Sequence, residues 1–494
     1  MNKDFHIFKT KSNSIYLYDA NTNTIHPWDE QLNEEVTREI YNSSDTAFKQ
    51  MFILNDMDQN LLRYIERWRI WTEAFKTSPV YPMPGYNSID EVPRSIRGKL
   101  WLSDLILIPS EECNFRCAYC TYSDDLYNNM RKHSNQFMKW DTAKKAIDLF
   151  LEFNNQLIFK GFSKRALNMV FYGGEPLLNW DIVKKGIEYA NSKKQNHYKF
   201  MTSISTNLTL MKKEYLPFLR SHEVFINVSL DGPEKEHDRY RHFVNGKKTY
   251  SQVKDKLKMI RMFDQDYFDK YVKVIPTITG NSDAVSIYEF FESKDEDIPK
   301  LQTMSFLRDM DICGFHEIYP YDKQKFAKDI ESVREQYVEK KINGTKFFKG
   351  DFLYFFIDEI LTILYNTTHY FNSSRAWYTG TCFPSRKIAV NPDGRLHMCE
   401  RMSDDYHIGD VNSGIDFQKV LFLINNYFRK APDCSSCWAR NMCNICHALV
   451  AADNTFDFGN RCNEVKKQVH ANLAQLYSIL EKNPQAFVGD FNHY

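Results

Sequence analysis

The feature that most constrains this chain is the spacing of its cysteines, because ten of the eleven fall into two sets. Cys113, Cys117 and Cys120 form a CxxxCxxC loop. The second set is C-terminal and comprises Cys382, Cys399, Cys434, Cys437, Cys443, Cys446 and Cys462. Cubane [4Fe–4S] clusters are held by cysteine thiolates, and three thiolates leave one iron open to a substrate or cofactor. The seven others approach the eight that two further clusters need, and only Cys313 lies outside both sets.

Disulfides and zinc are the alternative uses of these thiols. Disulfide frameworks are typical of short secreted chains, whereas this one has 494 residues and opens without a signal-peptide pattern. CxxC pairs also bind zinc, so zinc stays open for the C-terminal set. The first loop suits zinc less well, because a structural zinc site needs four ligands. The loop itself offers no fourth Cys or His, and His133 is the nearest candidate along the chain.

Composition narrows the class of partner. Lysine plus arginine equals aspartate plus glutamate at 64 each, so the net charge is zero. A nucleic acid or anionic membrane bound mainly by electrostatics is therefore disfavoured. No apolar run approaches the ~20 residues that span a bilayer. A thiol-rich chain with neither a signal nor a span is predicted to work in a reducing cytoplasm.

The length predicts roughly two to four domains, and the first is a small α+β module over residues 1–95. Its expected elements are strands at Phe5–Lys9, Ser14–Tyr18 and Thr24–Trp28, then helices near Gln31–Tyr41 and Asn60–Phe75.

Residues 96–320 alternate between apolar runs and helical stretches such as Asp141–Phe153, for which Asp141 is the expected N-cap. The runs are Leu105–Pro109, Asn168–Tyr172, Phe200–Ser205, Val224–Leu230, Val272–Ile278 and Thr303–Leu307. This order predicts an α/β fold with a parallel sheet, an incomplete (β/α)6 TIM-like barrel. Such barrels carry their chemistry at the carboxyl ends of the strands, where Cys113, Gly173–Pro176, Thr206-Asn207 and Asp231–Pro233 fall.

The remainder is predicted to be a helical bridge over residues 321–375 and a Cys-rich domain over 376–494. An aromatic stripe in the bridge (Phe348, Phe352, Phe355 and Phe356) is expected to be a buried helix face. The last domain should contain a hairpin, Lys387–Asn391 with Arg395–Cys399, and a final helix near Glu464–Leu480. Bound metal clusters would stabilise the fold of this otherwise irregular segment.

The first cysteine loop, followed by Tyr172-Gly173-Gly174-Glu175-Pro176, resembles the radical S-adenosylmethionine (SAM) enzymes. The C-terminal pattern resembles the SPASM extension, which carries two auxiliary [4Fe–4S] clusters; here x2 rather than x3 precedes Cys446. The resemblance implies three [4Fe–4S] clusters and SAM, whose reductive cleavage gives a 5′-deoxyadenosyl radical that abstracts a substrate hydrogen.

The same resemblance implies roles for single residues. It places Tyr119 at the adenine, Gly173, Gly174 and Glu175 at the SAM amino group, Ser205 and Asn207 near the ribose, and Ser229 with Arg241 near the carboxylate. It assigns Cys382, Cys399 and Cys446 to the nearer auxiliary cluster, and Cys434, Cys437, Cys443 and Cys462 to the outer one. The nearer cluster then has an open iron unless Cys313 reaches it. In the related sulfatase-maturing enzymes, the position of Glu400 resembles that of a proposed general base. Glu400 is therefore expected either to accept a proton or to pair with a nearby Arg or Lys.

The expected function is that of a peptide-modifying oxidoreductase. The resemblance extends to maturases that form thioether (Cys sulfur to carbon) cross-links in ribosomally made peptides. Their winged-helix-like N-terminal modules bind an extended leader as an added strand. The implied partners are a precursor peptide and a reductant such as flavodoxin or ferredoxin. The alternatives are a formylglycine-generating sulfatase maturase, a carbon–carbon cross-linking maturase, and an iron–sulfur regulator that binds DNA.

Overall fold

The computed structural model describes residues 4–29, 32, 37, 63, 65–70, 72, 102–123, 126, 131–159, 166–193, 199–293, 295–307, 314–369, 387–431, 434, 436–452 and 455–489. Cys313, Cys382 and most of the two helices expected between residues 31 and 75 lie outside these ranges. Within the second of those helices, residues 65–70 are helical.

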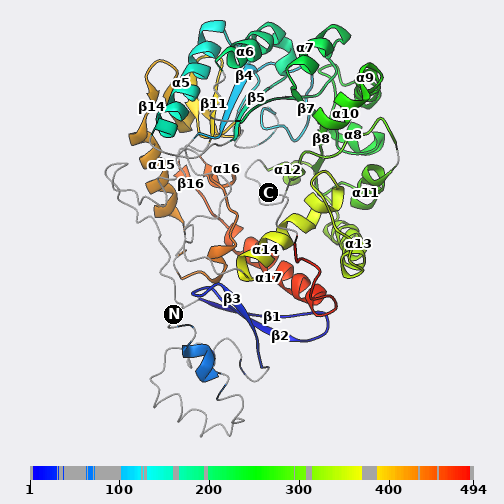
Figure 1. The fold of residues 1–494 in the computed structure, drawn as a ribbon, viewed down its shortest axis with the longest axis vertical. Coiled ribbons are helices and arrows are strands. Elements are labelled where there is room, and N and C mark those ends of the chain that lie inside the picture. The colour runs from blue at the N-terminus through cyan, green and yellow to red at the C-terminus, as the bar shows by residue number, and fades with distance from the viewer. Residues whose placement is uncertain are drawn as a thin grey trace.

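The predicted parallel sheet forms the centre of the molecule (Figure 1). Its strands are β4 (Asp104–Ser110), β5 (Ala166–Gly173), β6 (Lys199–Thr206), β7 (Phe225–Ser229) and β8 (Val272–Ile275). Each pairs with the next in parallel. The fifth predicted strand is divided at Pro276, which has no N–H to donate to a ladder. Beyond it, β9 (Thr277–Ile278) pairs instead with β10 (Ser305–Phe306).

Helices cover the outside of this sheet (Figure 1). They are α5 (Trp140–Phe159), α6 (Trp180–Ser192), α7 (Leu216–Ser221), α8 (Glu234–Tyr240), α9 (Tyr250–Phe263), α10 (Gln265–Tyr271) and α11 (Ala284–Glu292). The N-cap prediction for Asp141 is wrong, because α5 already begins at Trp140. Asp141 instead lies in the first turn, where a carboxylate suits the helix dipole, and pairs with Lys145 at 2.6 Å.

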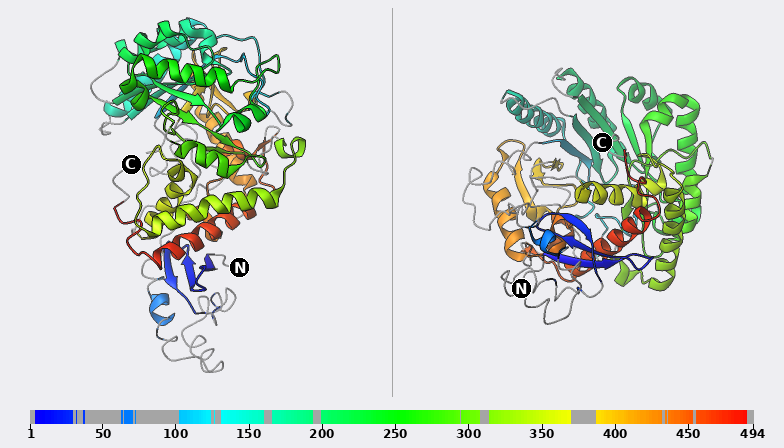
Figure 2. Two further views of the ribbon diagram at one scale, coloured as in Figure 1. Left: turned by 90° about the vertical axis from the view of Figure 1, so that its right-hand side faces the viewer. Right: turned by 60° about the horizontal axis from the view of Figure 1, so that its bottom comes forward.

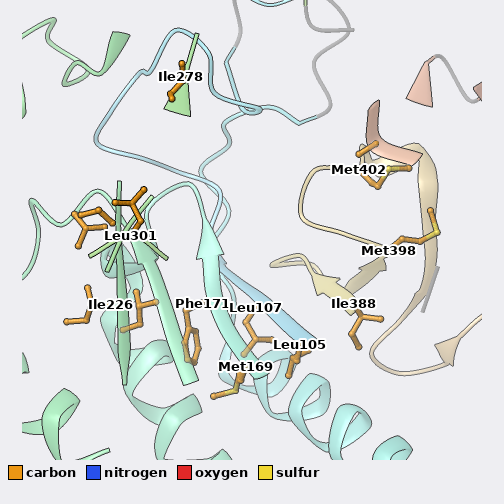
Figure 3. Packing of buried hydrophobic residues seen from close by; sticks show 14 of the residues in the cluster. Leu105, Leu107, Met169, Phe171, Ile226, Ile278, Leu301, Ile388, Met398 and Met402 are labelled. Carbon is orange, nitrogen blue, oxygen red and sulfur yellow. The ribbon is translucent and has the colours of Figure 1, made fainter. Parts of the chain in front are cut away.

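The C-terminal strands extend the same sheet, which the sequence analysis did not predict. They are β11 (Lys387–Val390), β12 (Arg395–His397), β13 (His407–Asp410) and β14 (Gly414–Ile415), and β11 pairs with β4 in parallel. The strand order is β14-β13-β12-β11-β4-β5-β6-β7-β8. The two parts therefore share one core, in which Leu105, Met169 and Phe171 lie near Ile388 and Met398 (Figure 3).

The rest of the C-terminal region consists of short elements and one long helix. They are α15 (Phe417–Lys430), α16 (His447–Val450), β15 (Ala451–Ala452), β16 (Thr455–Phe456) and α17 (Arg461–Leu480). The last confirms the predicted final helix, which begins three residues before Glu464.

The bridge is helical as predicted, in pieces: α12 (Phe315–Ile318), α13 (Lys323–Ile342), a π-helical turn (Tyr354–Asp358) and α14 (Glu359–His369). Phe352 is 1% exposed and stacks on Phe356 with ring centroids 5.6 Å apart, which confirms a buried aromatic face there. Phe348 lies before this helix and is 47% exposed, so it does not belong to that face.

At the N-terminus the three predicted strands are present as β1 (Phe5–Lys9), β2 (Ile15–Asp19) and β3 (Thr24–Pro27), and they form an antiparallel sheet. It lies against α17, away from the central sheet (Figures 1 and 2). In the described part of the chain, no helix is both long and apolar enough to cross a membrane.

Candidate active site

The first cysteine loop leaves the carboxyl end of β4 and is clamped to the segment after α8. The amide of Arg116 donates to the carbonyl of His242 at 2.9 Å, and that of Val244 donates to the carbonyl of Asn114 at 3.1 Å. Phe115 is 2% exposed and meets Phe243 edge to face. The loop is therefore held by main-chain bonds and a buried ring.

Two glycines after β5 let a neighbouring backbone approach this loop closely. The amides of Gly174 and Glu175 donate to the carbonyls of Ser110 and Glu112, each at 2.9 Å. A Cβ on Gly174 would lie 2.2 Å from the carbonyl oxygen of Glu112. Gly173 has φ +121°, a conformation that other residues rarely adopt. The Gly-Gly-Glu motif thus braces the cysteine loop against the sheet.

Amide and guanidinium N–H groups point at the three thiols. The amide of Phe115 lies 3.4 Å from Cys113 Sγ and that of Tyr122 lies 3.4 Å from Cys120 Sγ. Arg241 Nη1 approaches Cys117 Sγ at 3.9 Å, and Asn207 Nδ2 approaches Cys113 Sγ at 3.8 Å. Burial raises the pKa of the Cys117 thiol to about 12, and raises those of Cys113 and Cys120. Thiolates at this site therefore require a cationic partner.

Asp231, which the sequence analysis placed on the rim without a role, organises two of the predicted SAM contacts. Arg241 pairs with it bidentately, with Nε–Oδ2 at 2.8 Å and Nη2–Oδ1 at 3.1 Å. The Tyr119 hydroxyl donates to the same carboxylate, and the Arg241 guanidinium lies 5.3 Å from the Tyr119 ring centroid. The amide of Thr277 donates to Asp231 at 2.9 Å. A buried carboxylate after a strand end is the signal that could have revealed this role.

Glu175 is fully buried, and its carboxylate joins the rims of β5 and β6. It accepts hydrogen bonds from the Thr206 hydroxyl at 2.7 Å, the Leu177 amide at 3.0 Å and the Asn207 amide at 2.8 Å. Burial raises its pKa to about 7. The two serines predicted as SAM contacts lie at the carboxyl ends of adjacent strands, Ser205 on β6 and Ser229 on β7.

The C-terminal set reaches the same rim through Cys399. The amide of Arg401 lies 3.2 Å from its Sγ, and burial raises the pKa of the Cys399 thiol to about 12. Tyr172, at the end of β5, lies close enough to both Cys120 and Cys399 to be affected electrostatically by each thiolate. Arg401 is likewise affected by Cys399 and Cys446. Cys120 of the first set and Cys399 of the second therefore both lie within electrostatic range of Tyr172.

Cys434, Cys437 and Cys443 lie in the segment between α15 and α17, and Cys462 lies in the first turn of α17. Cys434 and Cys437 are linked by a turn in which the amide of Cys437 donates to the carbonyl of Cys434 at 3.3 Å. Burial, with added repulsion from Cys437 and Cys462, raises the pKa of the Cys443 thiol to about 11. Cys437 and Cys462 thus lie within electrostatic range of Cys443, and the assignment of these four cysteines to one cluster remains a prediction.

A profile of the radical SAM superfamily matches residues 107–289, from β4 to α11. Residues 107–289 are a radical SAM domain. The cysteine-type anaerobic sulfatase-maturating enzyme of Clostridium novyi is 25% identical over 318 residues, 63% of this chain and 76% of that protein. The radical SAM cyclopropyl synthase TigE of Paramaledivibacter caminithermalis is 28% identical over 141 residues, 26% of this chain and 27% of that protein.

A solved structure shares the fold of the radical SAM domain and its surroundings. Native anSMEcpe with bound AdoMet and Kp18Cys peptide has a TM-score of 0.55 and 21% identity, and the match covers 76% of this chain and 99% of that one. At this identity the likeness establishes the fold.

The superfamily implies a [4Fe–4S] cluster and SAM at the radical SAM loop, and the residues present fit both. None of the nine cysteines that the structure describes is in a disulfide. In the same described residues, no three Cys, His, Asp or Glu side chains converge tightly enough for a single metal ion. In a cubane each thiolate binds a different iron, and N–H donors to sulfur tune the cluster. Cys113, Cys117 and Cys120 have this donor shell.

Glu400 follows Cys399 and forms an ion pair with Lys387, with Oε2–Nζ at 3.1 Å. Burial alone would raise its pKa, but Lys387 and Arg401 outweigh burial and hold the pKa of Glu400 below its ordinary value. Glu400 is therefore ionised at neutral pH and is only a weak base. The cation pairing named as the alternative is present, and a proton-accepting role remains a prediction.

Proposed function

We propose that this radical SAM enzyme is a peptide maturase that installs thioether cross-links in a ribosomally made precursor, using SAM and three [4Fe–4S] clusters. The observation that carries the proposal is the meeting of two cysteine sets at one rim. Tyr172 lies within electrostatic reach of Cys120 from the first set and Cys399 from the second. A substrate at this rim would contact both a radical source and a second iron–sulfur site.

When bound, SAM would supply the 5′-deoxyadenosyl radical and the clusters would exchange single electrons. The protein's own side chains position the groups of the SAM-binding rim. Asp231 holds Arg241 in a fixed orientation beside Tyr119, where a planar guanidinium can receive a carboxylate. Glu175 ties β5 to β6 beneath the cysteine loop. These contacts fix the SAM-binding rim before the cofactor arrives.

Seven C-terminal cysteines are one short of two complete auxiliary clusters. The cluster assigned to Cys382, Cys399 and Cys446 would then keep an iron free for a precursor thiolate. A carbon radical formed nearby would join that sulfur. The hydrogen atom leaves on 5′-deoxyadenosine, the thiol proton leaves to solvent, and one electron leaves to the auxiliary cluster. Each cross-link removes two hydrogens from the precursor.

The N-terminal sheet supports a role in holding a leader. Its strand order is β1-β2-β3, so β1 and β3 are its two edge strands; β1 contacts α17 and β3 contacts α14. An extended leader could add to β3 through main-chain hydrogen bonds. A leader with N-methylated backbone amides should therefore bind more weakly than the unmodified leader in a fluorescence polarisation titration. Equal affinity would contradict strand addition.

The decisive experiment is anaerobic turnover of a cysteine-containing precursor, analysed by mass spectrometry. Thioether formation should remove two hydrogens per link and protect the cysteine from alkylation. Replacing the precursor cysteines with serine should abolish the mass loss while uncoupled 5′-deoxyadenosine still forms. A serine precursor that loses two hydrogens would contradict thioether formation and favour oxidation or a carbon–carbon link.

Formylglycine formation is the second candidate, favoured by the 25% identity to a cysteine-type sulfatase-maturating enzyme. The same turnover assay separates the two, because conversion of cysteine to formylglycine exchanges sulfur for oxygen. A cysteine product that has lost its sulfur would support sulfatase maturation, whereas a thioether retains it.

A further inference from the structure

The turn that carries two outer cysteines is fastened to the N-terminal sheet rather than to the barrel. This turn, Trp438–Asn441, lies between Cys437 and Cys443. Arg440 reaches from it to Asp4 in a buried ion pair, with side-chain exposures of 3% and 10%. The same Nη1 donates to the carbonyl of Cys437 at 3.3 Å. One guanidinium thus links the N-terminal segment to the backbone of a predicted cluster ligand.

Neighbouring contacts make the attachment two-sided. Arg440 Nη2 donates to Asn21 at 3.1 Å, and Asn441 Nδ2 donates to the Tyr18 hydroxyl at 3.0 Å and the Ala20 carbonyl at 2.9 Å. Asp4 is itself held in position, because its main-chain carbonyl accepts a hydrogen bond from the amide of Ala20 at 2.8 Å. Arg440 and Asn441 are therefore tied to the residue before β1 and to the end of β2, which pair at the open end of the hairpin.

The sheet also contacts the helix that supplies the last cysteine. His6 on β1 stacks on Trp438 with ring centroids 3.7 Å apart, and its Nε2 lies 2.8 Å from Nδ1 of His470 on α17. Cys462 lies in the first turn of that helix. The N-terminal sheet thus bridges both arms of the outer set, and Figure 2 shows it lying against α17.

We propose that the Asp4–Arg440 pair positions the outer cluster's ligand turn, so that the N-terminal sheet is part of that cluster's protein shell. Removing one partner of a buried ion pair leaves the other charge uncompensated, and here that charge bonds directly to the carbonyl of Cys437. The inference rests on the proposed outer cluster at Cys434, Cys437, Cys443 and Cys462. It adds that a segment more than 400 residues away along the chain controls the retention of the cluster.

The test measures iron release to a chelator from anaerobically reconstituted full-length protein. Cys462→Ala first defines the iron fraction that belongs to the outer set, expected to be roughly a third of the total. Asp4→Asn should release that same fraction at least ten-fold faster than wild type. Uncoupled SAM cleavage, which reports the barrel, should stay unchanged. Lys11→Ala is the matched control, because it breaks an exposed contact of the same sheet with Glu331 on α13.

Several outcomes would overturn the proposal. Wild-type release kinetics in Asp4→Asn would show that the pair does not hold the turn. Faster release of all iron together with lost SAM cleavage would show general unfolding. If Asp4→Asn folds poorly, Arg440→Lys replaces it: lysine keeps the charge but cannot bond to Asp4, the Cys437 carbonyl and Asn21 at once, so the outer iron should leave faster than from wild type, and wild-type release would overturn the proposal. If Cys462→Ala removes no iron, the outer cluster itself is absent, and both this inference and that part of the proposed function fall.

Discussion

The cysteine loop of the radical SAM domain is held by main-chain bonds inside the barrel, whereas the outer cysteine turn is held by side chains of a separate sheet. Around Cys113, the supporting groups are the carbonyls and amides of strands and loops, with Gly174 packed against Glu112. Around Cys437, the supporting groups are mainly side chains: the Arg440 guanidinium paired with Asp4, the Asn441 amide on β2 and the Trp438 ring stacked on His6.

This difference teaches which changes each site should tolerate. A loop fastened mainly by backbone contacts is sensitive to added volume at its glycines. A turn fastened by a buried ion pair is sensitive to one charge from far along the chain. The two sites should therefore fail independently, and the following variants test that independence.

The largest effect is expected from removing the ligands themselves. Changing Cys113, Cys117 and Cys120 together to alanine should abolish SAM cleavage and remove roughly a third of about twelve irons. Iron analysis and 5′-deoxyadenosine chromatography measure the two losses. The matched control changes Cys434, Cys437, Cys443 and Cys462 to alanine, which should remove a similar share of iron but leave SAM cleavage. Zinc in place of iron at the C-terminal set would contradict the auxiliary-cluster assignment.

Gly174→Ala should come next. Its Cβ would lie 2.2 Å from the Glu112 carbonyl, and the main chain of the cysteine loop would have to shift. We expect SAM cleavage to fall at least ten-fold and the free energy of unfolding to fall by about 1–3 kcal/mol. Gly344→Ala is the control, since Gly344 has φ +84° but open space at its Cβ. It should lower stability without affecting SAM cleavage; equal losses in both variants would mean that steric contact at Gly174 is unimportant.

Asp231→Asn should have a smaller effect on SAM cleavage, acting through SAM affinity, and should also lower the stability of the fold because Arg241 loses its buried partner. The change removes the charge that orients Arg241, and charge-assisted hydrogen bonds are worth about 1.5–3 kcal/mol, so the dissociation constant for SAM should rise about ten-fold or more. Equilibrium titration with SAM measures this. Asp393→Asn breaks the more exposed pair with Arg395 and should leave SAM binding unchanged. If Asp231→Asn binds SAM with unaltered affinity, the predicted contact of Arg241 with SAM would be contradicted.

The strands of the parallel sheet and the cysteine loop at the end of the first of them could be predicted from the sequence, because both depend on local patterns. Strand ends and CxxC spacings lie within a few residues of one another. The pairing of β11 with β4 could not be predicted, since it joins strands nearly 300 residues apart and either strand alone looks like any apolar run. Likewise Asp4 and Lys387 carry no motif, and their roles appear only when the fold brings their partners close.

The smallest effect is expected from Glu400→Gln. Lys387 and Arg401 depress the pKa of Glu400 in the folded state, so its contribution to stability is present above the ordinary carboxyl pKa and is lost as pH falls through the depressed value. Acid unfolding of the Gln variant should lack this component, and its stability at neutral pH should be modestly lower.

If Glu400 only pairs with Lys387, precursor modification should stay within about two-fold of wild type, as expected for a group without a proton-transfer role. If it accepts the substrate proton, modification should fall by about 100-fold or more while uncoupled 5′-deoxyadenosine formation continues. Lys387→Met separates the cases further: it removes the cation that weakens the base, so a catalytic Glu400 would shift the pH profile of modification upward, whereas a structural one would leave that profile in place.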